Sequence, residues 1–213
     1  MTDDLIARLA AETPAIPANA LGRRFGLGLL VGGVATLAVV LAWLGLRPDM
    51  DQAMHGMRFW MKAIYTMWVT LAALPLAIGL SRPGGRVGKW PWLVLAAAPA
   101  LMALMSLGEL MRTPDTGWLA LVVGDSISVC SKRILLLSLP IFAALVWVFR
   151  RLAPTRLTLA GLTAGLIAGG LSATLYGLHC QETSATFVTL WYTLGMAAAG
   201  LLGAATSRWL LRW

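Results

Sequence analysis

Six long apolar runs dominate this chain and leave few folds open to it. A helix needs about 20 apolar residues to cross a hydrocarbon core of ~30 Å, and runs of about that length recur from end to end. None of them alternates apolar and polar residues, as the strands of a membrane β-barrel would. We therefore predict an all-α polytopic membrane protein with these six transmembrane helices: Phe25–Leu46, Phe59–Leu80, Pro91–Met111, Ile134–Phe149, Leu157–Leu178 and Thr186–Ser207.

The fourth run is the shortest of the six. We expect its helix to extend back toward Ile127, with the long side chains of Lys132 and Arg133 reaching to the membrane interface. The composition agrees with a membrane protein, since 59% of the residues are hydrophobic and only 12% are charged. A soluble domain has about 25% charged residues.

The positive charges predict the orientation. Eleven of the 17 Lys and Arg residues fall in the N-terminal segment, the second and fourth connections and the C-terminus, and six fall on the opposite side. The positive-inside rule then places both termini in the cytoplasm of a bacterial inner membrane. The net charge of +8 is explained by orientation and by contact with lipid headgroups, so we predict no direct nucleic-acid partner. No signal peptide is evident, and we expect the first span to be an uncleaved anchor.

Residues 1–24 form the one sizeable cytoplasmic segment, and residues 25–213 form the six-helix membrane domain. The pattern of residues in the N-terminal segment predicts a short helix with acidic residues in its first turn and apolar residues on one face. Two prolines end this helix. A helix of about ten residues is unstable alone in water, so it should order only on contact with a partner. The inner leaflet and a protein surface both remain open as that partner. The residues of interest are Asp3, Asp4, Leu5, Ile6 and Leu9.

Small residues repeat at four-residue spacing within several spans. Such steps let helices approach closely, and packing within one chain is the first explanation, with a homodimer as the alternative. The steps are Gly28–Gly32, Gly161–Gly165–Gly169 and Gly195–Ala199–Gly203.

Ionisable residues are nearly absent from the middle of the spans, where catalytic and transport sites usually carry them. Lys62 and Glu109 lie near the predicted external ends. The chain has no H-E-x-x-H, C-x-x-C, P-loop or G-x-S-x-G motif. We therefore predict that the protein is not an enzyme and holds no cofactor.

The two cysteines are the strongest candidates for chemistry. Cys130 precedes the fourth span and Cys180 follows the fifth, so both should lie at the external end of one antiparallel helical hairpin. The outside of a bacterial inner membrane favours disulfides. Closing a loop of about 50 residues would stabilise one arrangement by about 4 kcal/mol. Two unrelated, buried cysteines that act as small apolar side chains are the alternative.

A metal site is a second hypothesis for the same loop. His179, Cys180 and Glu182 combine a thiolate with an imidazole, a donor set that suits soft metal ions such as zinc, cadmium or copper(I). A further ligand, such as Cys130 or His55, would be required.

Several motifs resemble the NrsF family of multi-pass anti-sigma factors, over the whole chain. The most specific is Gly177-Leu178-His179-Cys180-Gln181-Glu182, followed by Phe187 and by Leu190-Trp191-Tyr192-Thr193-Leu194-Gly195. The opening Thr2-Asp3-Asp4-Leu5-Ile6, Cys130 with Ser138-Leu139-Pro140, Ala153-Pro154-Thr155-Arg156 and the end Arg208-Trp209-Leu210-Leu211-Arg212-Trp213 are also similar. Family members often have proline after the second cysteine, where this chain has Gln181.

The resemblance implies an inner-membrane protein that sequesters an extracytoplasmic-function sigma factor through its N-terminal segment. It further implies that oxidative or heavy-metal stress acts through Cys130 and Cys180 to release the sigma factor. Disulfide formation, reduction and metal ligation all stay open as the chemical event. Two other classes remain as alternatives: a thiol–quinone redox protein, which typically needs two cysteine pairs, and a small transporter built from inverted repeats.

Overall fold

The computed structural model describes residues 20–82, 84–85 and 87–212, and regular structure in these ranges is helical. The first helix, α2, continues into a π-helical turn, η1, and a second such turn, η2, leads into the last helix. The elements are α2 (Ala20–Val39), η1 (Val40–Leu44), α3 (Met50–Met54), α4 (Met57–Leu80), α5 (Lys89–Arg112), α6 (Asp115–Val123), α7 (Cys130–Arg150), α8 (Leu157–Tyr176), α9 (Ala185–Phe187), η2 (Val188–Tyr192) and α10 (Thr193–Leu210).

Six helical units in this part of the chain are long and apolar enough to cross a membrane, which confirms that part of the prediction. Each unit differs from its predicted bounds by one residue or more, and the largest differences are at the starts of the first and the fourth. The first unit begins by Ala20 and so includes Arg23 and Arg24, which the prediction left outside. The fourth begins at Cys130 and not at Ile127, because residues 124–129 form turns.

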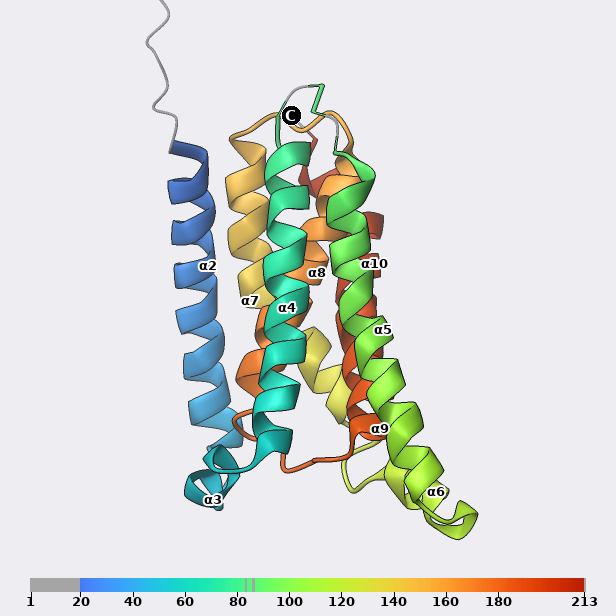
Figure 1. Cartoon of the computed structure of the whole chain (residues 1–213). Helices are drawn as coiled ribbons and strands as arrows, with labels where there is room; N and C mark the ends of the chain where they lie inside the picture. The colour runs from blue at the N-terminus through green and yellow to red at the C-terminus, as the bar shows by residue number, and fades with distance from the viewer. Residues whose placement is uncertain (1–19, 83, 86, 213) are drawn as a thin grey trace, which may run out of the picture.

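The long helices form one bundle in which α8 is central (Figure 1). It packs against α4, α7 and α10, whereas α2 lies on the outside against α7 and α5 packs on α4. We call the end that holds Ala20, the 151–156 connection and the C-terminus the terminal end. The opposite end, which holds α3, α6 and both cysteines, is the cysteine end.

The small-residue steps pack inside the molecule. A Cβ atom added to Gly161 or Gly165 of α8 would collide with backbone carbonyl oxygens of α10. One added to Gly32 of α2 would lie 2.6 Å from the Cα of Ile141 in α7. The glycines therefore set the helix separations within one chain, which is the packing role that their spacing predicts.

The outer surface is apolar. Leu30, Val31, Leu104 and Leu201 are more than half exposed, on helices that face away from the bundle centre. Contiguous exposed apolar surface of this kind marks contact with a membrane or with another protein.

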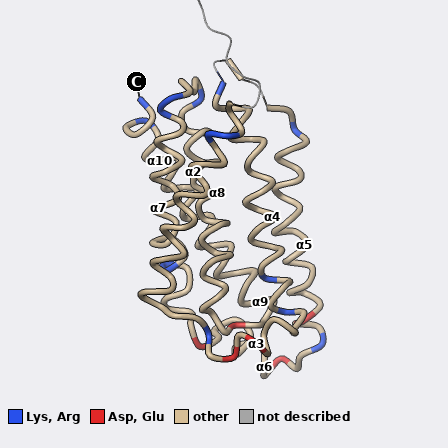
Figure 2. The backbone as a smooth tube through the Cα atoms, turned by 90° about the vertical axis from the view of Figure 1, so that its left-hand side faces the viewer, with Lys and Arg blue, Asp and Glu red and all other residues tan. Residues whose placement is uncertain are grey.

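Charged residues gather at the two ends of the bundle, as Figure 2 shows. The terminal end carries Lys and Arg, whereas every Asp and Glu among the described residues lies at the cysteine end. This is the asymmetry that the positive-inside rule uses.

Candidate functional site

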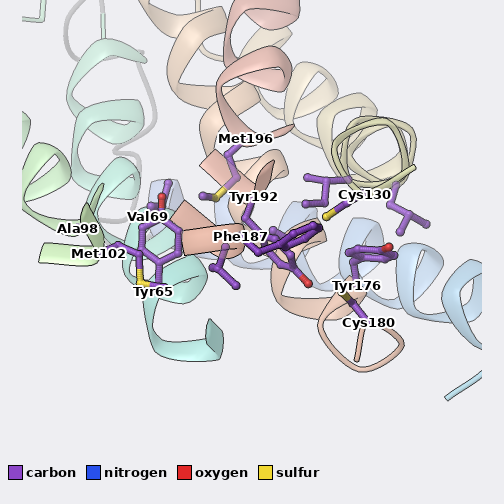
Figure 3. Packing of buried hydrophobic residues seen from close by; sticks show 14 of the residues in the cluster. Tyr65, Val69, Ala98, Met102, Cys130, Tyr176, Cys180, Phe187, Tyr192 and Met196 are labelled. Atoms are coloured by element: carbon purple, nitrogen blue, oxygen red, sulfur yellow. The ribbon is translucent and has the colours of Figure 1, made fainter. Parts of the chain in front are cut away.

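The fold brings the two cysteines together at one end of the bundle. Cys130 is the first residue of α7, and Cys180 lies in the connection that follows α8. Both are free thiols, with exposed fractions of 0% and 4%. They share one apolar cluster with Tyr176 and Tyr192, whose rings lie 6.0 Å apart, and Figure 3 shows both cysteines beside these rings.

Local turns hold each thiol in place. The amide of Cys180 donates to the carbonyl oxygen of Tyr176 at 3.0 Å, which continues the last turn of α8. The amide of Cys130 donates to Ser126 O at 3.0 Å and starts α7 in the same way.

Lys62 lies beneath this site, and its ammonium group contacts the Cys180 connection. The side chain comes from α4 and is only 2% exposed. Its Nζ donates to Cys180 O at 2.8 Å and to Glu182 O at 3.2 Å, and it lies 5.6 Å from the ring centroid of Tyr192. Within the described ranges no carboxylate forms a salt bridge with it.

Glu182 connects the two segments that carry the cysteines. One of its carboxylate oxygens accepts from Asp125 N at 2.7 Å and from Ser126 N and Oγ at 3.0 Å. The same turn includes Gly124, whose φ of 50° favours glycine and whose missing side chain leaves room for the carboxylate. Glu182 therefore ties the turn before Cys130 to the connection that holds Cys180.

His179 connects the site to the first helix. Its Nδ1 donates to Gly45 O at 3.1 Å, and Arg133 Nη1 donates to its Nε2 at 3.3 Å. The amide of Arg47 also donates to Leu178 O at 3.0 Å. The chain that follows η1 at the cysteine end is therefore hydrogen-bonded to the connection that carries Cys180.

The side chains proposed as metal ligands already form hydrogen bonds within the protein. Both ring nitrogens of His179 and the carboxylate of Glu182 bond to protein groups, as described above. No group of three or more His, Cys, Asp or Glu side chains converges within the part of the chain that the structure describes.

A polar cavity of about 440 Å³ opens beside Cys180. Arg47, Arg133, His179 and Glu182 are among its lining residues, and Cys130 is not. Small molecules therefore have a route to one thiol of the pair.

Two electrostatic effects stand out at this end. The guanidinium of Arg47 forms a two-point salt bridge with Asp49, at 2.8 and 2.7 Å, which lowers the pKa of Asp49. The pKa of the Cys180 thiol is also lowered, first by a hydrogen bond from Cys130 and then by the positive charge of Lys62, against a burial effect that raises it.

Sequence reasoning missed Lys62 and Tyr192. No role is predicted for Lys62 from the sequence, although a single lysine within a long apolar run indicates a functional position. The predicted sigma-binding residues Asp3, Asp4, Leu5, Ile6 and Leu9 lie outside the described residues.

Comparison with known proteins decides the family. The family described as "NrsF: Negative regulator of sigma F" matches residues 9–213. The chain belongs to the NrsF family. It is 47% identical to the anti-sigma-F factor NrsF of Caulobacter vibrioides over 213 residues, which cover 100% of this chain and 99% of that protein. It is 33% identical to the probable anti-sigma-F factor NrsF of Azospira oryzae over 214 residues, with the same coverage.

Membership gives the protein a regulatory role, as a negative regulator of sigma F, and neither relative is named as an enzyme. No solved structure matches the chain.

Proposed function

We propose that this NrsF protein is an anti-sigma factor of the bacterial inner membrane that sequesters an extracytoplasmic-function sigma factor and releases it when Cys130 and Cys180 are modified. Residues 1–24 form the sigma-binding segment in the cytoplasm, and residues 25–213 form the membrane-embedded sensor. The observation that carries the proposal is the pairing of two buried, free thiols at the end of the bundle opposite α2's first residue.

The bonds around His179 supply a physical link between the two ends. The Cys180 connection holds the chain just after η1 through two hydrogen bonds, and α2–η1 runs from there to the terminal end. Along its length α2 contacts α7: Thr36 Oγ1 donates to Leu137 O at 3.1 Å, and Phe25 packs edge-on against Phe149 at 5.4 Å. A change at the thiols that moves the connection would shift α2 against α7, and α2 continues from the sigma-binding segment.

Burial explains why the thiols suit a switch. Cys130 and Cys180 are buried in an apolar cluster that includes Tyr176 and Tyr192, so a disulfide or an added group has to displace packed neighbours. Cores of this kind respond by changing between discrete packings and not by gradual deformation.

Capture of the sigma factor tests the binding half. Sigma factor should copurify with the native protein from membranes, and it should be lost in Leu9→Asp, which places a charge on the apolar face of the predicted helix. Ala7→Asp adds the same charge to the opposite face and should retain capture. Equal capture by the two variants would contradict the assigned binding segment.

Treatment with an oxidant or with a metal ion tests the proposed sensing by the two cysteines. Brief exposure of the membranes to a hydroperoxide or to cadmium ions should release the sigma factor from the native protein, and Cys130→Ser or Cys180→Ser should block that release. Thr183→Ala alters an exposed residue of the same connection and should respond normally. A normal response in both serine variants would end the sensor hypothesis and leave the binding result intact.

A further inference from the structure

The two thiols differ in what surrounds them. Cys130 is fully enclosed, whereas Cys180 lines the cavity of about 440 Å³ at the cysteine end. A reagent that enters this cavity meets Cys180 first. Access alone, however, does not make a thiol reactive, because the thiolate is the nucleophile.

Lys62 supplies the missing charge. Lys62 is only 2% exposed and forms no salt bridge with a carboxylate among the described residues. Burying an ammonium group in this way costs free energy unless nearby groups stabilise its charge. Its two hydrogen bonds hold the backbone at Cys180 and at Glu182, on either side of Gln181. The same group therefore fixes the position of the Cys180 connection and places a positive charge beside its thiol.

We propose that Lys62 is a positioning residue that makes Cys180 the attacking thiol of the pair and leaves Cys130 as the resolving thiol. The inference rests on the proposed sensing function and adds the order in which the two cysteines react.

The groups around Cys180 support this division. Positive groups near it are Lys62 from α4, Arg47 from the connection after η1 and Arg133 from α7. The remaining titratable groups around the thiol and its cavity are Tyr176, Tyr192, Cys130, His179, Glu182 and Asp125. The pKa of Cys180 is lowered by the hydrogen bond from Cys130 and by the charge of Lys62. Tyr192 Oη is buried without a hydrogen-bond partner among the described residues. Its hydroxyl is therefore free to donate a hydrogen bond to a thiolate at Cys180.

With a hydroperoxide as oxidant the chemistry has two steps. The Cys180 thiolate attacks the distal peroxide oxygen, the O–O bond breaks, and the leaving alkoxide takes up a proton to give an alcohol and a sulfenic acid at Cys180. The Cys130 thiol then attacks that sulfur, and water leaves as the disulfide forms. The sulfur atoms lose two electrons, which the peroxide gains.

Alkylation tests the proposal without the sigma factor. Membranes that contain the full chain but no sigma factor are treated with iodoacetamide from about pH 5 to about pH 9, a range that spans the ordinary thiol pKa of ~8.5, and each cysteine is followed by peptide mass spectrometry. Cys180 should react first, with a rate that falls only well below pH 8.5. In Lys62→Met the whole pH profile should move upward, so that at any pH below the Cys180 pKa the rate falls by about tenfold for each unit by which that pKa rises.

Two further variants separate charge from packing. Lys62→Arg keeps the charge and should retain most of the shift, whereas Arg58→Met removes an exposed charge at the same end and should leave the profile unchanged. A merely structural Lys62 would alter rates at both cysteines and would not move the pH profile. Cys130 reacting before Cys180 in the native protein, or a Lys62→Met profile equal to the native one, would overturn the proposal. If Lys62→Met does not accumulate, the native order of labelling and the Lys62→Arg profile still decide it.

Discussion

At the scale of single residues, two carboxylates carry much of the order at the cysteine end. Glu182 accepts three hydrogen bonds from the turn before α7, and Glu109 of α5 accepts from Ser184 Oγ and from Thr186 N and Oγ1 at the start of the last helix. A charged acceptor that satisfies several donors stabilises more than a neutral one does. Both glutamates therefore act as structural anchors around the thiols.

Glu182→Ala should loosen the turn that precedes Cys130. Three donors lose their acceptor, and a hydrogen bond to a charged group contributes about 1.5–3 kcal/mol, so we expect a loss of roughly 2 kcal/mol in a partly exposed site. Alkylation of Cys130 should become faster, and the unfolding temperature in detergent should fall. Asp125→Asn changes a neighbouring carboxylate that makes none of these bonds and serves as the control. Native alkylation rates in Glu182→Ala would show that the anchor is unimportant.

At the scale of elements, α2 is the helix that links the two ends. The chain just after η1 is bonded to the Cys180 connection, and α2 approaches α7 at Gly28 and Gly32. There the side chain of Val148 and the backbone of Ile141 leave no space for a Cβ. The π-helical turn η1 lies at the outer end of this helix, and η2 lies beside the thiols in the last one. Such turns are frequent at functional sites.

Gly32→Ala should separate α2 from α7. The new Cβ would lie 2.6 Å from backbone of Ile141, so the helices have to move apart, which typically costs about 1–3 kcal/mol. Gly33→Ala is the matched control, because its Cβ would make an ordinary contact of 3.6 Å with Leu171. We expect Gly32→Ala to weaken thiol-dependent release of the sigma factor in membrane pull-downs while Gly33→Ala responds normally. Equal responses would exclude α2 as the link.

At the scale of the whole molecule, the apolar outer surface and the uneven charges of its two ends argue for insertion with the terminal end inward. Lys and Arg cluster at that end, and acidic residues of the described ranges are confined to the other (Figure 2). Cys130 is fully buried and Cys180 is reached only through a cavity, so a bulky membrane-impermeant reagent reports poorly on which side the native thiols face.

Exposed positions test the orientation more directly. In a chain whose two native cysteines are replaced by serine, Gln181→Cys should react with a membrane-impermeant maleimide in intact spheroplasts. Thr155→Cys, which is also an exposed position and lies at the terminal end, should react only after the membrane is opened. The reverse pattern would invert the proposed topology.

Particular residues show how far the sequence could be interpreted. The six apolar runs predicted six long helices, since the length and polarity of a membrane helix are properties of local sequence. The positions of Cys130 and Cys180 at the two open ends of one hairpin followed from the order of the spans. Lys62 could not be assigned this way, because its partners, the carbonyls of Cys180 and Glu182, lie 118 and 120 residues away along the chain.

The sequence by itself determined the class of this protein, the number of its long helices, the end of the bundle that carries the thiols and, through its motifs, the NrsF family. Hydrophobic length and charge asymmetry are sums over local residues, which no tertiary contact changes. Only the tertiary structure decided that the cysteines share one apolar cluster with Tyr176 and Tyr192. It also decided that Lys62 lies against the Cys180 connection and that His179 and Arg47 join this site to α2. These contacts depend on the separations between helices, which glycines facing backbone atoms of distant spans determine.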